Sequence, residues 1–200
     1  MEDLYYTIRQ PSSEILFKEK KSKFFGYAYP ISTEDEIKSL LEKIQKKHPT
    51  ANHICYAWQL GIEPVSYRAY DDGEPTNTAG MPIYGQIQSF GVTNVLVIVA
   101  RVFGGTKLGT GGLIAAYRHA AKMSLEGTKI IQKTLKEYIK LSFQYENINI
   151  IMRTIKQQKV TIHSQQLDLA CELVISVRKN DAAEVRRLFK AIKGVGVFST

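Results

Sequence analysis

The chain has 200 residues, of which 44% are hydrophobic, and a formal net charge of +8 at pH 7. This composition is typical of a soluble globular protein without low-complexity tracts. No apolar run is long enough to span a bilayer, and the first residues, MEDLYYTIRQ, lack the basic and apolar regions of a signal peptide. Cys55 and Cys171 lie far apart, which argues against a disulfide scaffold and indicates a cytoplasmic location.

The positive charge is unevenly distributed along the chain. Residues 1–133 carry 16 Lys and Arg against 13 Asp and Glu, whereas residues 134–200 carry 11 against 6. Such an excess makes polyanions, nucleic acid above all, candidate partners. A basic surface that only aids solubility is the alternative, and the charge alone does not decide between the two.

The first seventy residues show strand and helix patterns in turn. Aromatic-rich segments over 4–9 and 13–29 predict strands, and the second segment forms a hairpin that turns near Lys20. A helix is predicted over 34–48, where Thr33 and Glu36 form a capping box. Residues 53–60 alternate as a strand does, and a partner strand follows over 65–70.

His53 and Cys55 fall on the same face of the strand over 53–60. A histidine beside a cysteine can act as base and nucleophile, or the two can be metal ligands. Because no further cysteine is nearby, we interpret both as buried structural residues.

An acidic turn over residues 71–75, DDGEP, comes next. Its three carboxylates can bind a hard cation, supply acid–base groups, cap the following helix or pair with Arg68 and Arg101. The spacing is not that of a calcium-binding loop, so we assign no metal and no cofactor. Thr78 is the predicted N-cap of a helix that carries Ile83, Ile87 and Phe90.

Residues 94–125 combine a buried strand, a glycine-rich loop and a helix. The apolar, β-branched run over 94–103 predicts a central strand covered on both faces. The loop Gly104–Gly112 then leads into an alanine-rich helix over 113–125. Such a unit can hold a phosphate on free N–H groups at the helix start. The loop matches neither common nucleotide-binding glycine pattern, so close packing of glycine against a neighbouring backbone is the alternative.

Residues 134–200 form a second set of elements. Strands are predicted over 136–145, 159–166, 169–178 and 195–199, with one helix capped by Asn147 and another by Asp181. The order β-α-β-β-α-β is that of a ferredoxin-like domain. We therefore expect an α+β protein with two domains, residues 1–130 and 134–200.

Three separated motifs carry a family resemblance. They are Asp71-Asp72-Gly73-Glu74-Pro75, Thr78-Ala79-Gly80-x-Pro82 and Arg101-x-Phe103-Gly104-Gly105-x-x-Leu108-Gly109. Together with Cys55-Tyr56-Ala57 they resemble the signature of the IMPACT family, in its bacterial two-domain YigZ branch. Asn77 differs from the glycine that relatives usually carry before Thr-Ala-Gly.

The resemblance implies a fold for each domain and a link to translation. The N-terminal domain would share the β/α fold of a ribosomal small-subunit protein domain and of domain four of elongation factor G. The C-terminal domain would be ferredoxin-like, similar to domain five of that factor. Eukaryotic relatives are linked to translational control through a protein partner, and bacterial members are proposed to bind nucleic acid or the ribosome. No enzymatic activity is implied as a family property, and a shared fold does not by itself transfer function.

Our leading hypothesis is a cytoplasmic protein that binds RNA or the ribosome and regulates translation. Two basic patches hold the phosphate-binding candidates, which are Arg101, Gly104, Gly105, Lys107, Gly109, Arg118 and Lys122 in one, and Arg186, Arg187 and Lys190 in the other. The first alternative is an enzyme or phosphate-ligand binder that uses the Gly104–Gly112 loop and the turn of Asp71, Asp72 and Glu74. The second is a module that binds a protein of the translation machinery. We favour binding over catalysis and expect the acidic turn, Arg101 and the loop to meet on one surface.

Overall fold

A computed structural model describes residues 3–199, which form a mixed α/β protein of two compact units. The N-terminal unit spans Tyr5–Lys133. The C-terminal unit begins at Thr134 and also includes Asp3 and Leu4 from the start of the chain. In the part of the chain that the structure describes, no helix combines the length and the apolar character needed to cross a membrane.

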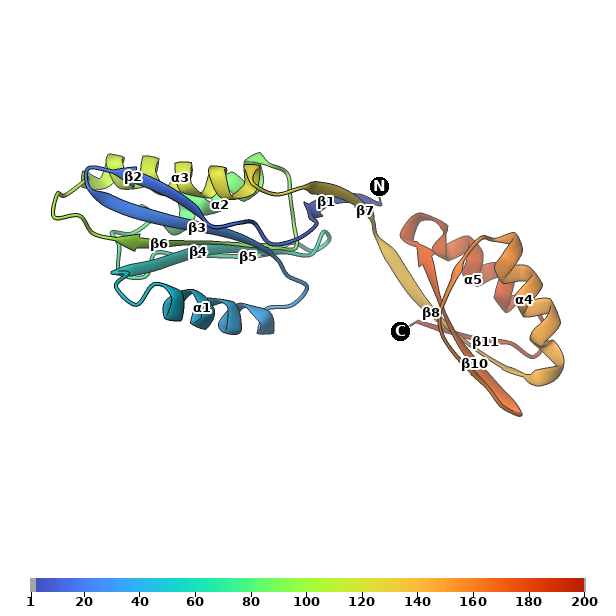
Figure 1. The fold of residues 1–200 in the computed structure, drawn as a ribbon. Coiled ribbons are helices and arrows are strands. Elements are labelled where there is room, and N and C mark those ends of the chain that lie inside the picture. The colour runs from blue at the N-terminus through green and yellow to red at the C-terminus, as the bar shows by residue number, and fades with distance from the viewer. Residues whose placement is uncertain (1–2, 200) are drawn as a thin grey trace. The chain divides into compact units, whose positions relative to one another are not determined.

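The N-terminal unit is built on a five-stranded antiparallel sheet in the order β2-β3-β6-β4-β5. Its strands are β2 (Ile15–Glu19), β3 (Ser22–Pro30), β4 (His53–Leu60), β5 (Ser66–Tyr70) and β6 (Val95–Val102). Helix α1 (Asp35–Lys47) covers one face of the sheet, and α2 (Gly80–Ser89) and α3 (Gly109–Glu126) cover the other (Figure 1). A separate two-stranded sheet pairs β1 (Leu4–Ile8) with β7 (Ile130–Thr134).

Strand β6 lies at the centre of this sheet, which explains its uninterrupted apolar sequence. Odd-numbered residues from Val95 to Val99 belong to the core beneath α2 and α3, and even-numbered residues from Leu96 to Ala100 belong to the core beneath α1. All six side chains are fully buried, so the prediction of a strand covered on both faces is confirmed. The pattern arises here between antiparallel neighbours.

Two helices begin at other residues than predicted. Helix α2 has Ala79 at its N-cap position, and the hydroxyl of Thr78 instead donates a hydrogen bond to the Pro75 carbonyl at 2.6 Å. Helix α3 begins at Gly109, so Gly111 and Gly112 belong to the helix and not to the loop. Glycine disfavours a helix, but buried Leu108 and Leu113 anchor this first turn in the core, and tertiary packing outweighs local propensity.

The C-terminal unit has the predicted order of elements. They are β8 (Lys136–Gln144), α4 (Ile148–Gln157), β9 (Thr161–Leu167), β10 (Ala170–Arg178), α5 (Ala182–Lys190) and β11 (Gly196–Ser199), with a short 3-10 turn before each helix (Tyr145–Asn147 and Lys179–Asp181). The strands form an antiparallel sheet in the order β11-β8-β10-β9, and both helices lie on one face of it (Figure 1). Asn147 and Asp181 stand at the predicted N-cap positions, although neither side chain makes a capping hydrogen bond.

Asp3 attaches the start of the chain to the C-terminal unit. Its carboxylate accepts two hydrogen bonds from the Arg178 guanidinium, each 3.0 Å long, and its carbonyl accepts one from the Leu135 N–H at 2.6 Å. The hydrogen bonds from Arg178 are the main reason why the pKa of the Asp3 carboxyl lies below its ordinary value.

Candidate functional site

A cavity of about 480 Å³ lies beside the end of β6, the loop that follows it and the first turn of α3. Polar and apolar residues line it together, namely Asn52, His53, Glu74, Pro75, Arg101, Phe103, Lys107, Leu108, Gly109, Thr110 and Leu113. The acidic turn contributes Glu74, and the loop contributes Lys107 and Gly109. The acidic turn therefore meets Arg101 and the loop here as predicted, although only one carboxylate of the turn lines the cavity.

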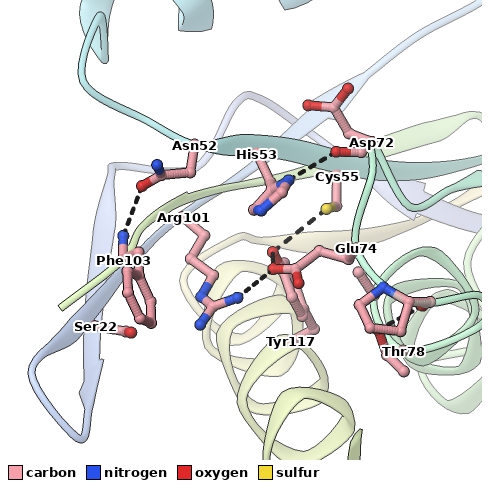
Figure 2. A network of polar contacts seen from close by, with 12 residues as sticks. Ser22, Asn52, His53, Cys55, Asp72, Glu74, Thr78, Arg101, Phe103 and Tyr117 are labelled. Atoms are coloured by element: carbon pink, nitrogen blue, oxygen red, sulfur yellow. Dashed lines mark hydrogen bonds and ion pairs between the residues drawn. The ribbon is translucent and has the colours of Figure 1, made fainter. Parts of the chain in front are cut away.

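Glu74 and Arg101 form a buried ion pair at this cavity. The Oε1 atom of Glu74 lies 2.6 Å from Nη1 of Arg101 and accepts a second hydrogen bond from the Tyr117 hydroxyl at 2.7 Å (Figure 2). Glu74 is 8% exposed and Arg101 is 5% exposed. Of the two pairings considered for the acidic turn, the one with Arg101 is confirmed, whereas Arg68 lies over the ring of Tyr70.

The ion pair leaves the guanidinium of Arg101 incompletely hydrogen-bonded. Its Nε atom is buried and has no hydrogen-bond partner among residues 3–199. The rings of Phe24 and Phe103 each have their centre 5.6 Å from Cζ of Arg101, which holds the group in place. A buried donor without an acceptor is costly, so this atom marks a place where an acceptor would be stabilising.

Tyr117 and Cys55 form the buried floor behind the ion pair. The Cys55 sulfur lies 3.0 Å from the Asp71 carbonyl oxygen and 3.4 Å from the Tyr117 hydroxyl oxygen. Burial raises the pKa of the Cys55 thiol and that of the Tyr117 phenol well above their ordinary values, so both groups stay protonated. Cys55 is fully buried, and its predicted structural role is confirmed.

The prediction that His53 is buried is wrong. Its side chain is only partly buried and lines the cavity because β4 begins at this residue, at the edge of the core. Its Nδ1 atom lies 2.8 Å from the carbonyl oxygen of Asp72 (Figure 2). A carbonyl only accepts hydrogen bonds, so Nδ1 is the donor in this contact.

The carboxylates of Asp71 and Asp72 accept hydrogen bonds from backbone N–H groups. Asp71 accepts hydrogen bonds from the N–H groups of Asn77, Ala79 and Gly80 at 2.8 to 3.0 Å, and so caps the start of α2. Asp72 accepts one from the Ile54 N–H at 2.6 Å. Of the roles open to Asp71, helix capping is therefore the one observed. Within residues 3–199 no group of three or more His, Cys, Asp or Glu is placed to hold a metal ion.

Asn77 occupies a left-handed position, with a φ of 62°. Glycine adopts this conformation freely, and asparagine tolerates it better than most residues. Asparagine is therefore compatible with a turn in which the family resemblance implies glycine.

Glycine occupies the positions of the loop for different physical reasons. A Cβ on Gly104 would lie 2.0 Å from the Lys21 carbonyl carbon, so close backbone packing, one of the two predicted alternatives, holds for this residue. Gly105 and Gly109 have φ values of +86° and +72°, which favour glycine. Gly111 has neither constraint, because its φ is not left-handed and no atom lies within 4 Å of an added Cβ.

The predicted basic residues lie in separate places. Lys107 lines the cavity with Arg101, whereas Arg118 lines a groove with Met81 and Ile114. Lys122 lies 3.6 Å from Glu126, one turn further along α3. In the C-terminal unit, Arg186 pairs with Glu137 at 2.8 Å. Arg187 and Lys190 are exposed on α5.

Sequence reasoning missed several residues of the cavity wall. Asn52, the residue before β4, accepts a hydrogen bond from the Phe103 N–H at 2.8 Å and so links the start of β4 to the end of β6. Tyr117 was assigned to the core of α3 but not to the site. A signal for Tyr117 existed, since a buried tyrosine hydroxyl needs a hydrogen-bond partner and Glu74 supplies it.

The fold and the cavity define a mixed α/β protein of two units with a buried ion pair beside a glycine-rich loop. The Impact N-terminal domain family matches residues 20–125. IMPACT family member YvyE of Bacillus subtilis is 31% identical over 155 residues, which cover 78% of this chain and 71% of that protein. IMPACT family member YigZ of Escherichia coli is 37% identical over 122 residues, which cover 60% of each protein. The chain belongs to the IMPACT family.

Solved structures extend the likeness in fold. The crystal structure of a hypothetical protein aligns with 100% of this chain and 98% of its own, at 25% identity and a TM-score of 0.74. The two-domain translational regulator Yih1 aligns with 57% of this chain and 46% of its own at 27% identity, and its TM-score of 0.35 is too low to show a shared fold.

Proposed function

We propose that this protein binds RNA or the ribosome through phosphate contacts and so regulates translation. Membership of the IMPACT family supports the link to translation, because the family resemblance implies a role in translational control for the eukaryotic relatives. The observation that carries the proposal is a group of exposed lysines at one end of the N-terminal unit. We call this group the basic end, and it comprises Lys18, Lys20, Lys21, Lys23 and Lys107.

Close backbone packing brings the basic end together. The turn between β2 and β3 and the loop between β6 and α3 lie at the same end of the sheet (Figure 1). Gly104 fits directly against the backbone of Lys21, and its N–H donates a hydrogen bond to the Ser22 hydroxyl at 3.2 Å. Lys20 also shares a groove with Leu108, at the start of α3. The lysines of the turn are therefore neighbours of the loop that carries Lys107.

The charges of the basic end are free to act on a partner. All five lysines are exposed, and none belongs to an ion pair among the residues that the structure describes. Lysines in this state neutralise phosphates and release the counterions of a nucleic acid, which favours binding at low salt. They carry little sequence information, so we expect affinity for RNA with weak base preference.

The other predicted basic residues extend the proposal. Arg118 on α3 and the pair Arg187 and Lys190 on α5 are exposed and available for phosphate contacts. Arg186 and Lys122 have acidic neighbours, so their contributions would be smaller. A protein partner in the translation machinery remains the alternative that the test below separates from RNA.

The finer assignments of fold, domains and compartment belong to the same proposal. The strand order β11-β8-β10-β9 supports a ferredoxin-like domain over residues 134–200. The five-stranded sheet with its three helices supports a domain over residues 1–130 that resembles domain four of elongation factor G. The two compact units support this division. Both cysteines are free and buried, as expected in the reducing cytoplasm.

The test is RNA binding as a function of salt. Fluorescence anisotropy with tRNA and ribosomal RNA fragments, at about 50 to 200 mM salt, should show affinity that falls steeply as salt rises. The double variant Lys20→Gln/Lys21→Gln should weaken binding and reduce the slope of log K against log salt by about 1.4 to 1.8, because two phosphate contacts are lost. Glutamine keeps the length of the side chain at these two positions.

A matched variant controls for net charge. Lys38 and Lys46 are exposed on α1 and do not belong to the basic end. The variant Lys38→Gln/Lys46→Gln therefore removes the same amount of charge from a different part of the N-terminal unit. This variant should retain the slope of the unmodified protein. Equal loss in both variants would show a general charge effect, and an absence of binding at about 50 mM salt would overturn the proposal. Capture of a protein that survives nuclease treatment would favour the protein-binding alternative.

A further inference from the structure

We propose that the cavity at the start of α3 is a binding site for a phosphomonoester. The phosphate would lie on the first N–H groups of α3, between Arg101 and Lys107. The inference goes beyond RNA backbone binding at the basic end and does not depend on it, because it rests on Arg101 and the start of α3, and only Lys107 is common to both.

The start of α3 offers unpaired backbone donors. The first N–H groups of a helix have no partner within the helix, and the helix dipole places partial positive charge at this end. No side chain caps α3, since the N-cap residue is Leu108. Thr110 and Gly109, at the first turn, line the cavity. Phosphate groups are the common ligands of such a helix start.

Arg101 provides an independent indication of an anion. Its side chain is 5% exposed and lines the cavity, where Figure 2 shows the guanidinium between Phe103 and Glu74. Its Nη1 atom donates a hydrogen bond to Glu74, whereas its Nε atom is buried without a partner among the described residues. A phosphate oxygen would supply the missing acceptor in a charge-assisted hydrogen bond.

Gly111 provides the third indication. Glycine is less favourable than alanine inside a helix, and neither backbone conformation nor packing explains its presence here. By contrast, a Cβ on Gly112 would lie 3.1 Å from the Leu108 side chain, so packing accounts for that glycine. Gly111 does not itself line the cavity, but its N–H is one of the first donors of α3 and a Cβ tilts toward the start of a helix. Close approach of a ligand to these donors is therefore a reason for glycine at this position.

The charge and shape of the cavity fit an organic phosphate. Glu74 neutralises Arg101, so the excess positive charge comes from Lys107 and the helix end. Phe103, Pro75 and Leu113 form apolar walls that can hold the organic part of the ligand. A volume of about 480 Å³ lies in the range of small-molecule sites. The ligand can be a free nucleotide or sugar phosphate, or the phosphorylated end of an RNA.

Calorimetric titration of the full chain tests the site with defined probes. We expect weak binding of inorganic phosphate and tighter binding of adenosine 5′-monophosphate, because the latter also fills the apolar walls. Two oligoribonucleotides of one sequence, with a 5′-phosphate or a 5′-hydroxyl, distinguish the source of the phosphate. Preference for the phosphorylated oligonucleotide indicates that the natural ligand is an RNA end. If the mononucleotide binds but the two oligonucleotides bind equally, the natural ligand is a small molecule. Failure of all phosphate probes to bind at millimolar concentration would overturn the proposal.

Two glycine substitutions make the test specific. Gly111→Ala adds a methyl group that tilts toward the first N–H groups of α3, on which the phosphate would lie, and should weaken binding of the mononucleotide about ten-fold or more. Gly85→Ala, in α2, is the matched control, since Gly85 also has open space around an added Cβ but lies inside its helix, away from the unpaired N–H groups of a helix start. Both variants should fold at least as well as the unmodified protein, because alanine favours a helix. Equal nucleotide affinity in the two variants would contradict the site.

A further variant removes charge. Lys107→Ala should also weaken nucleotide binding by about ten-fold, because one charge-assisted contact is lost. Lys107 belongs to the basic end as well, so only Gly111→Ala separates the two proposals. That variant should retain salt-dependent RNA binding while it loses the nucleotide.

Discussion

Glu74 and Arg101 place two opposite charges where water has almost no access. Taking both from water is costly, and the pair is tolerated because Tyr117 donates a further hydrogen bond to the same carboxylate oxygen. Glu74→Gln keeps the shape but leaves the Arg101 charge without a counter-charge. We expect the free energy of unfolding to fall by about 3 kcal/mol. Urea unfolding followed by the fluorescence of Trp58, the single tryptophan, would measure it in the N-terminal unit.

A variant of Arg101, the other member of the ion pair, supplies the control for Glu74→Gln. Arg101→Met in the Glu74→Gln background replaces the remaining buried charge with an apolar side chain of similar length. Since a buried ion pair can be replaced by apolar groups at little cost, the double variant should recover much of the loss. Additive losses in the two positions would mean that each side chain acts separately.

The individual roles in the acidic turn could be predicted only in part. The sequence indicates carboxylates near a helix start, and ion pairing of Glu74 and capping by Asp71 were among the alternatives. The choice depends on distance in space, since Asp71 reaches N–H groups eight and nine residues ahead, beyond the range of local capping patterns. Thr78 fits the local pattern and is displaced from the cap because Asp71 already occupies it.

At the scale of elements, Gly104 determines how the loop after β6 meets the β2–β3 turn. A methyl group here would lie 2.0 Å from a backbone carbon of Lys21, which cannot move as a flexible side chain does. Gly104→Ala should therefore reduce the free energy of unfolding by about 1–3 kcal/mol, by overpacking. The change should also shift the NMR signals of Lys21 and Ser22. Gly111→Ala, seven residues later, should not destabilise the protein, and equal destabilisation would contradict the assigned packing.

At this scale, elements that follow from a local pattern of apolar residues could be predicted from the sequence. Contacts between segments far apart in the chain could not. Strand β6 and the alternation in β4 follow from which residues are apolar. The start of α3 was placed four residues late, because Gly109-Thr110-Gly111-Gly112 has loop composition and only the burial of Leu108 and Leu113 reveals a helix. The same limit applies to Arg101, whose unpaired Nε is visible only in three dimensions.

At the scale of the whole molecule, Asp3 belongs to the C-terminal unit although some 130 residues of the N-terminal unit follow it. Arg178 lowers the pKa of the Asp3 carboxyl below its ordinary value of 3.8. The unfolded chain therefore takes up this proton at a higher pH than the folded one. The stabilisation from Asp3 is present above the unfolded pKa and is lost as pH falls through the lower, folded one.

The acid sensitivity of the C-terminal unit should follow from this contact. In urea titrations followed by the amide NMR signals of β8, stability should decline as pH falls below about 4, and Asp3→Asn should be less stable at neutral pH with a shallower decline. Asp168→Asn makes the same chemical change at an exposed position between β9 and β10, and should leave the decline unchanged. If Asp3→Asn retains the full decline, other carboxylates determine it and Asp3 serves only through its backbone contact with Leu135.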